Sequence, residues 1–204
     1  MLLSFLIGFL AARAGRILQA ESFSNHRLTS YIASDEIRSK VKYLAERITN
    51  DFKDHFASQG REVLLVGVLN GSLVFLADLI REIKIPIQVD TIAASSYGNQ
   101  TVSSGKVTIT KSLSLDPRGK HVILVEDIVE TGLTLQAIKE HLLTLGVQSV
   151  QICSLLFKQK KDAVKHSIDY LGFDIEDRFV VGYGLDYAGL YRNLPFIAEL
   201  EFMV

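Results

Sequence analysis

One segment of the chain joins an uninterrupted apolar run to two adjacent acids and a hydroxyl-rich turn. It reads VILVEDIVETGLTL and extends from Val122 to Leu135. Four β-forming residues, ending at Val125, are typical of a strand that is covered on both faces of a parallel sheet. Glu126 and Asp127 follow directly. The segment therefore predicts a buried strand that delivers two carboxylates and a loop to one edge of a sheet.

The turn after this strand has the composition of a phosphate-binding loop. Gly132 allows close approach of the backbone, and Thr131 and Thr134 add hydroxyl donors to the amides of a helix start. Glu126 and Asp127 lie where a magnesium ion and a hydroxyl-rich ligand could be held. An ordinary strand-to-helix connection with a threonine cap and two solvated acids has the same spacing, so that alternative stays open at this point.

Strand and helix patterns alternate along the rest of the chain. Apolar residues three or four apart predict a helix from Ile37 to Phe56, with Ser34 as its cap. Continuous or alternating apolar runs predict strands at Val63–Leu69, Ile87–Ala94, Val107–Thr110 and Val150–Phe157, and further helices at Leu73–Ile83 and up to Leu145. This order predicts an α/β fold with a mainly parallel, doubly wound sheet. Ligands bind such sheets beyond the carboxyl ends of the strands, where Asn70, Gly71 and the acid pair are expected.

Length and composition limit the function classes. With 204 residues, the chain can form one α/β domain with a substantial core, which we expect at residues 31–204 after an N-terminal apolar extension at 1–30. A net charge of −1 leaves no basic excess for binding nucleic acid. The single cysteine, Cys153, cannot form an internal disulfide, which indicates a reducing compartment and predicts a cytoplasmic protein.

The N-terminal extension is apolar from Met1 to Ala12 and continues with Arg13 and Arg16. A secretory signal carries its positive charges before the apolar stretch, and a membrane span needs ~20 apolar residues, so membrane association is not expected. A short accessory helix, or a start codon placed too far upstream, fits better. A signal or anchor stays open as the alternative.

Four ordered blocks of the sequence carry a resemblance to a known family. The blocks are residues 122–135, VGVLNGSLVFLADLIR at 66–81, SSYG at 95–98 and RFVVGYGLDYAGLYRNLP at 178–195. Together they resemble the hypoxanthine-guanine phosphoribosyltransferases, which have the type I phosphoribosyltransferase fold with a small hood. The resemblance implies purine salvage, in which a pentosyltransferase moves 5-phosphoribosyl from 5-phosphoribosyl 1-pyrophosphate (PRPP) to hypoxanthine or guanine. The products would be IMP or GMP and pyrophosphate, the cofactor Mg²⁺, and the assembly a homodimer or homotetramer.

The resemblance also assigns the residues that would bind the donor. Glu126 and Asp127 should bind the ribose hydroxyls, directly or through magnesium. The 5-phosphate would be held by backbone and hydroxyl groups of Thr131, Gly132, Leu133 and Thr134. The pyrophosphate would be bound by Leu69, Asn70, Gly71 and Arg192, in a loop that often contains a cis peptide bond between the first two. Ser96 and Tyr97 belong to a catalytic loop that would close over the donor.

The purine site follows from the C-terminal block and from two departures from the family pattern. Phe179 is expected to stack on the base, Val180 to contact its edge, and Asp186 to bind a second magnesium ion. The family usually has aspartate at the position of Glu130, as general base or proton acceptor beside the purine. It also often has a lysine for the 6-oxo group where this chain has Ser167, and Lys165 is the candidate replacement.

These departures keep two other functions open. One is an enzyme that prefers xanthine, because the residue that recognises the 6-oxo group is not fixed. The other is a nucleotide-sensing regulator that has lost catalysis, which the longer side chain of Glu130 allows. A displacement of about 1 Å can cost roughly 10²-fold in rate where geometry is strict.

Overall fold

The structure is a computed structural model that describes residues 26–59, 62–96, 107–159 and 168–203. Side chains are described for these residues except 55–59 and 96. The expectations for the apolar extension before His26, for Tyr97 and for Lys165 therefore lie outside the described residues.

A six-stranded sheet forms the centre of the molecule, in the order β4-β3-β2-β5-β6-β7. Its strands are β2 (Val63–Val68), β3 (Gln88–Ser96), β4 (Val107–Lys111), β5 (His121–Val129), β6 (Ser149–Lys158) and β7 (Tyr170–Ile175). All neighbours run parallel except β4, which is antiparallel to β3. The mainly parallel α/β sheet expected from the sequence is confirmed.

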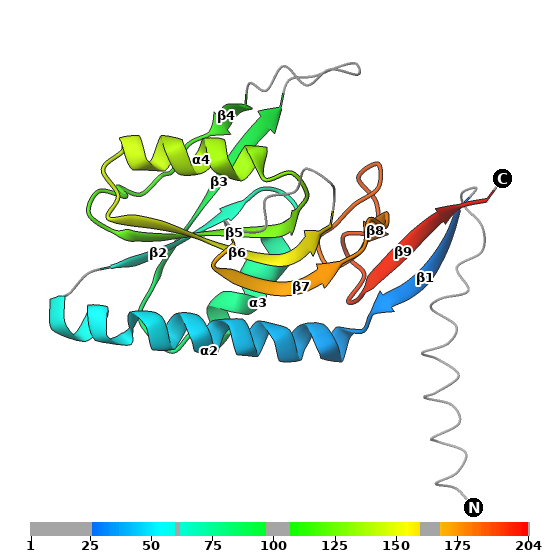
Figure 1. Cartoon of the computed structure of the whole chain (residues 1–204), viewed down its shortest axis with the longest axis horizontal. Coiled ribbons are helices and arrows are strands. Elements are labelled where there is room, and N and C mark those ends of the chain that lie inside the picture. Colours follow the sequence, from blue (N-terminus) through cyan, green and yellow to red (C-terminus); the bar gives the residue numbers. More distant parts are fainter. Residues whose placement is uncertain (1–25, 60–61, 97–106, 160–167, 204) are drawn as a thin grey trace, which may run out of the picture.

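Helices cover both faces of this sheet (Figure 1). The long helix α2 (Ser34–Gln59) and helix α3 (Leu73–Glu82) lie on one face, and α4 (Leu133–Thr144) lies on the other. Strand β2 is continuously apolar because its side chains alternate between two buried cores. Val63 and Leu65 belong to the core beneath α2 and α3, whereas Leu64 and Val66 belong to the core beneath α4. Successive side chains of a strand point to opposite faces, so a strand covered on both sides needs apolar residues throughout.

The strand that carries the acid pair is longer than expected. The apolar run predicted a strand that ends before Glu126, but β5 continues to Val129. The reason is its pairing with β6, which extends to Val129 opposite Phe157, whereas the pairing with β2 stops at Gly67 opposite Val125. Both acids therefore lie on a strand that extends past its neighbour β2, with one side turned to the loop that follows β2.

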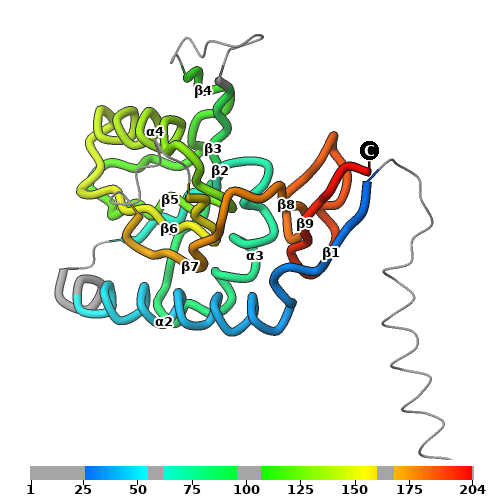
Figure 2. The backbone as a smooth tube through the Cα atoms, turned by 45° about the vertical axis from the view of Figure 1, so that its right-hand side comes forward, coloured from blue at the N-terminus to red at the C-terminus, as the bar shows by residue number. Residues whose placement is uncertain are grey.

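A second, three-stranded antiparallel sheet forms a hood from the two chain ends, in the order β1-β9-β8. Its strands are β1 (His26–Ile32), β8 (Val180–Val181) and β9 (Ile197–Phe202). Figure 2 shows this small sheet beside the main sheet, with the first and last described segments adjacent. The expected boundary between residues 30 and 31 falls inside β1, because Ser30 pairs with Ala198 and Leu28 with Leu200.

Strands β3 and β4 form an antiparallel arm at one edge of the main sheet (Figures 1 and 2). Ser95 and Ser96, expected at the start of a loop, are the last residues of β3 and pair with Thr108 and Val107. Within the described part of the chain, no helix combines the length and apolar character that crossing a membrane requires.

Candidate active site

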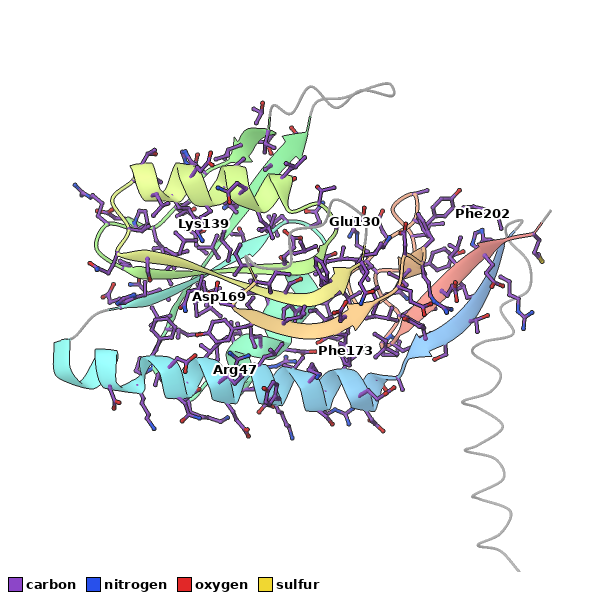
Figure 3. All side chains as sticks on the ribbon, viewed as in Figure 1. Arg47, Glu130, Lys139, Asp169, Phe173 and Phe202 are labelled. Atoms are coloured by element: carbon purple, nitrogen blue, oxygen red, sulfur yellow. The ribbon has the colours of Figure 1, made fainter. Side chains whose placement is uncertain are left out.

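A pocket of about 340 Å³ opens at the carboxyl edge of the main sheet. It is lined by Val68, Leu69, Ala94, Glu126, Ile128, Val129, Glu130, Thr131, Gly132, Thr134 and Leu135. These residues come from the ends of β2, β3 and β5 and from the start of α4. Six residues that the sequence assigned to donor binding or catalysis are among them. Figure 3 shows Glu130 at the end of the sheet that faces the hood.

The acid pair contacts the loop that follows β2. Asp127 is buried, and Gly71 lies so close to it that a Cβ atom on Gly71 would be 1.8 Å from Asp127 Oδ2. A side chain at this position would require the carboxylate of Asp127 to move. The structure thus brings together a residue predicted to bind ribose and a residue predicted to bind pyrophosphate.

The loop between β2 and α3 has a cis peptide bond between Leu69 and Asn70. The backbone N–H of Leu69 donates to the carbonyl of Ile92 on β3 (2.8 Å), and the buried hydroxyl of Ser72 donates to the carbonyl of Val68 (2.6 Å). The loop is therefore fixed at both ends, on one side to the neighbouring strand and on the other to the strand it leaves. The resemblance suggested this cis bond, but the residues alone could not establish it.

The turn between β5 and α4 has the geometry of an anion-binding loop. Gly132 is the residue before the helix and has φ of 80°, a conformation that favours glycine. Thr131 and Thr134 line the pocket, and the N-terminus of α4 directs its free N–H groups and partial positive charge toward it. The side chain of Leu133 is exposed, so any contribution to phosphate binding would come from its backbone.

The acid pair also has an unusual electrostatic environment. Burial raises the pKa of Glu126 well above its ordinary value, and hydrogen bonding and charge repulsion from Asp127 raise it further. Among the described residues, no ion pair with lysine, arginine or histidine neutralises either acid, and no group of three or more His, Cys, Asp or Glu side chains forms a complete metal site. Mg²⁺ is usually held by one or two carboxylates together with substrate oxygens, so this pair fits a magnesium ion that arrives with a substrate.

A lysine that the sequence reasoning missed occupies the position beside Glu130. Lys158 is the last residue of β6, its side chain is only 8 % exposed, and its Nζ lies 2.7 Å from Glu130 Oε1 and 3.7 Å from Asp177 Oδ1. The register explains the pairing, because Val129 lies opposite Phe157 and the next residue of each strand follows at the same edge. A lysine at the end of a strand, directly after the apolar run Leu155–Phe157, was the signal that could have revealed it.

The hood residues expected at the purine and pyrophosphate sites form two groups. Phe179 is 45 % exposed, and its ring packs edge-on against Tyr187 at 5.7 Å and Phe202 at 6.3 Å between centroids. Its neighbour Val180 is buried in β8.

Asp186 and Arg192 form the second group, as an ion pair of 2.6 Å. Asp186 also accepts the N–H of Gly189 (2.8 Å), and Arg192 donates to the carbonyl of Gly184 (2.6 Å). Arg192 lines a separate pocket of about 460 Å³ between α2, α3 and the hood, so the structure does not bring this pair into the pocket at the sheet edge.

The comparisons with known proteins agree with this arrangement. The model of the phosphoribosyl transferase domain family matches residues 33–188. The hypoxanthine-guanine phosphoribosyltransferase of Mycobacterium tuberculosis is 40% identical over 184 residues, which cover 89% of this chain and 90% of the relative. The chain belongs to the hypoxanthine-guanine phosphoribosyltransferase family.

Two solved structures of this family extend the comparison. The hypoxanthine-guanine phosphoribosyltransferase from Bacillus anthracis, with a HEPES molecule in its active site, is 45% identical, with a TM-score of 0.76 over 84% of this chain and 97% of that one. The second is the glutamic acid mutant from an analysis of an invariant aspartic acid in HPRTs. It is 37% identical, with a TM-score of 0.76 over 84% of this chain and 94% of that one.

Proposed function

We propose that the chain transfers the 5-phosphoribosyl group of PRPP to hypoxanthine or guanine, and so forms IMP or GMP and pyrophosphate in purine salvage. The observation that carries the proposal is the single pocket at the sheet edge. It joins Glu126 of β5, Leu69 of the pyrophosphate loop, and Thr131, Gly132 and Thr134 of the phosphate loop, and Gly71 lies beside it against Asp127. Each part has a chemical counterpart in PRPP, which carries ribose hydroxyls, a pyrophosphate and a 5-phosphate.

On the donor side, the 5-phosphate would be bound by the amides and hydroxyls of residues 131–134, with help from the dipole of α4. Glu126 and Asp127 would hold the two ribose hydroxyls. These contacts fix the ribose while the bond from its C1 to the pyrophosphate oxygen breaks and the bond to a purine nitrogen forms. Positive charge builds on the ring during this exchange, and nearby carboxylates stabilise it.

On the acceptor side, Glu130 and Lys158 form a donor-acceptor pair of opposite charge. The ammonium group of Lys158 can donate a hydrogen bond to the 6-oxo group of an oxopurine, and the carboxylate of Glu130 can accept the proton that the purine ring loses. The aromatic face of Phe179, partly exposed on the hood, would stack on the base. In this proposal Lys158 takes the role for which Lys165 was the candidate from sequence.

Glu126 and Asp127 would also hold Mg²⁺, and Asp186 remains the candidate ligand for a second ion. When bound, the ion supplies positive charge that offsets the two carboxylates and the pyrophosphate of the donor. The raised pKa of Glu126, the burial of Asp127 and the lack of an ion pair to either acid among the described residues support this assignment. Ser96 and Tyr97 as the closing loop, a homodimer or homotetramer, and a cytoplasmic location stay predictions.

Initial rates test the proposed function. The protein is incubated with PRPP and Mg²⁺ and with hypoxanthine, guanine or xanthine in turn, and pyrophosphate release is measured. Turnover with hypoxanthine or guanine supports the proposal. Turnover with xanthine alone would change the base assignment, and binding of PRPP without turnover on any of the three bases would favour a nucleotide-sensing regulator.

A further inference from the structure

A tight turn of the hood presses against the pyrophosphate loop. Gly182 and Leu185 exchange backbone hydrogen bonds of 3.0 and 3.1 Å, so Tyr183 and Gly184 form the tip of a two-residue turn. A Cβ atom on Gly184 would lie 2.2 Å from the carbonyl oxygen of Gly71. The tip therefore contacts the backbone of the loop that the function assigns to pyrophosphate.

The tip has an unexpected residue at its first position. Tyr183 has φ of 50° and Gly184 has φ of 103°, so both residues adopt positive φ. Turns of this kind favour glycine, asparagine or aspartate, and positive φ is a genuine outlier for a bulky side chain. The contacts of the Tyr183 side chain must therefore offset the cost of this backbone conformation.

The side chain of Tyr183 connects the hood to helix α3. It is 6 % exposed, and its hydroxyl donates to Asp78 Oδ2 at 2.6 Å. Asp78 also forms an ion pair with Arg81, one turn further along the same helix. Burial and the bond to Asp78 raise the pKa of Tyr183, so its hydroxyl remains a protonated donor at neutral pH. Helix α3 begins at Leu73, directly after the pyrophosphate loop, so the bond fixes the helix that carries the loop.

We propose that Tyr183 and Asp78 are a positioning pair that holds the pyrophosphate loop at Gly71 in the geometry that binds the leaving group. The inference rests on the proposed function, because it concerns one subsite of that reaction. Neither side chain lines the pocket at the sheet edge, and the pair acts through the backbone of Gly71 and Gly184. Its loss should therefore weaken pyrophosphate binding more than binding at the 5-phosphate loop.

The chain offers a matched control for this pair. Tyr170 on β7 is buried, and its hydroxyl donates to Asp51 on α2 at 2.9 Å. It is a tyrosine-aspartate bond of the same chemistry that joins a helix to the sheet. It lies outside the residues that line either pocket near the site. Tyr170→Phe should lower stability without a selective effect on pyrophosphate.

The experiment measures binding of inorganic pyrophosphate with Mg²⁺, and separately of IMP, by calorimetry on the full chain. We compare wild type, Tyr183→Phe, Asp78→Ala, the double variant and Tyr170→Phe. A hydrogen bond to a charged group corresponds to on the order of tenfold in affinity, and we expect about that loss for pyrophosphate in both single variants. The double variant should lose no more than Asp78→Ala alone, because Asp78→Ala already removes the bond to Tyr183. IMP affinity should change by less than about twofold, because neither side chain lines the pocket at the sheet edge.

The inference is overturned if Tyr183→Phe binds pyrophosphate like wild type, or if it loses IMP and pyrophosphate affinity equally, as Tyr170→Phe would through a general loss of stability. If Tyr183→Phe does not fold, the same comparison of pyrophosphate and IMP affinity is made with Asp78→Ala. Failure of the proposed function has a different signature, because wild-type protein would then show no turnover and would bind neither probe.

Discussion

Asp90 on β3 and Glu126 on β5 are both acids within the main sheet, but their surroundings differ in kind. The carboxylate of Asp90 accepts three backbone N–H groups, from Thr91 (2.7 Å), Ser114 (2.6 Å) and Leu115 (2.9 Å). Burial alone would raise the pKa of Asp90, but these N–H groups and the charge of Lys111 at 3.6 Å lower it.

Glu126 shows the opposite behaviour. Burial and the neighbouring Asp127 raise its pKa, and no described cation forms an ion pair with either acid. The comparison teaches that the protein satisfies the charge of Asp90 by itself, which makes Asp90 structural. The acid pair has no cation partner among the described residues. This is the property expected of a site that binds a cation and a polyhydroxyl substrate.

The largest effect that this comparison predicts is on Asp127. Asp127→Asn removes one of the two charges while keeping the size of the side chain, so it should weaken Mg²⁺-dependent PRPP binding and lower kcat/KM on the order of 10²-fold. The measurement is the KM for PRPP across a magnesium titration. Asp90→Asn is the control, and its KM should match that of wild type. Unchanged donor affinity in Asp127→Asn would remove the acid pair from the site.

The next effect concerns the lysine partners of the two acids Glu130 and Asp90, of which Lys158 is buried and Lys111 is partly exposed. Lys158→Met removes the ammonium group beside Glu130 and keeps most of the apolar stem, so the KM for hypoxanthine and guanine should rise about tenfold while the KM for PRPP stays the same. Lys111→Met, at the lysine beside Asp90, should leave both values unchanged. A rise in the KM for PRPP alone would place Lys158 on the donor side and contradict its assigned role.

A smaller effect is expected at Glu130. Glu130→Asp restores the residue usual in the family and should preserve or raise kcat, because aspartate keeps the charge that accepts the proton. Steady-state kcat on hypoxanthine and guanine is the measurement, with circular dichroism to confirm the fold. A large fall in kcat with normal folding would show instead that the distance from Lys158 is adapted to the longer side chain.

The smallest effect is a pH-dependent change in stability. Asp90→Asn should lower the free energy of unfolding by about 1–3 kcal/mol at pH 7, because three N–H groups lose a charged acceptor. The pKa of Asp90 is below 3.8 in the folded state, so its stabilisation is complete above about pH 4 and is lost as the pH falls through the lowered pKa. Chemical denaturation of wild type and variant at pH 7 and at pH 3 measures this difference, which should shrink at the lower pH.

Glu126→Gln gives the opposite sign and completes the comparison. Without magnesium, it should raise Tm at a pH above the raised pKa of Glu126, because it removes a charge that burial and the neighbouring Asp127 disfavour. If Glu126→Gln and Asp90→Asn destabilise the protein equally at pH 7, the two acids are both structural, and the distinction between them fails.

Sequence reasoning predicted the parts of this molecule that depend on local pattern. The strands β2 to β6, the helices that cover them and the threonine loop after the acids follow from periodicity and turn residues, and the hood followed from the resemblance, whereas β7 was not predicted. The extension of β5 past Glu126 was not predicted, because it depends on pairing with β6, which a single strand does not reveal.

Contacts between residues far apart in the sequence were not predicted. Lys158 was missed because its role depends on the register between two strands, which sets it beside Glu130. The bond between Tyr183 and Asp78 joins residues 105 positions apart, and neither residue stands out in its own segment. Such pairings arise only when the hood and the main sheet are placed relative to each other.

The most direct test of the account is a crystal structure of the protein with IMP and Mg²⁺. The account predicts the 5-phosphate on the amides of residues 131–134 and the ribose hydroxyls at Glu126 and Asp127, with the purine between Phe179 and Lys158. A nucleotide bound elsewhere, with that edge of the sheet unchanged, would contradict it.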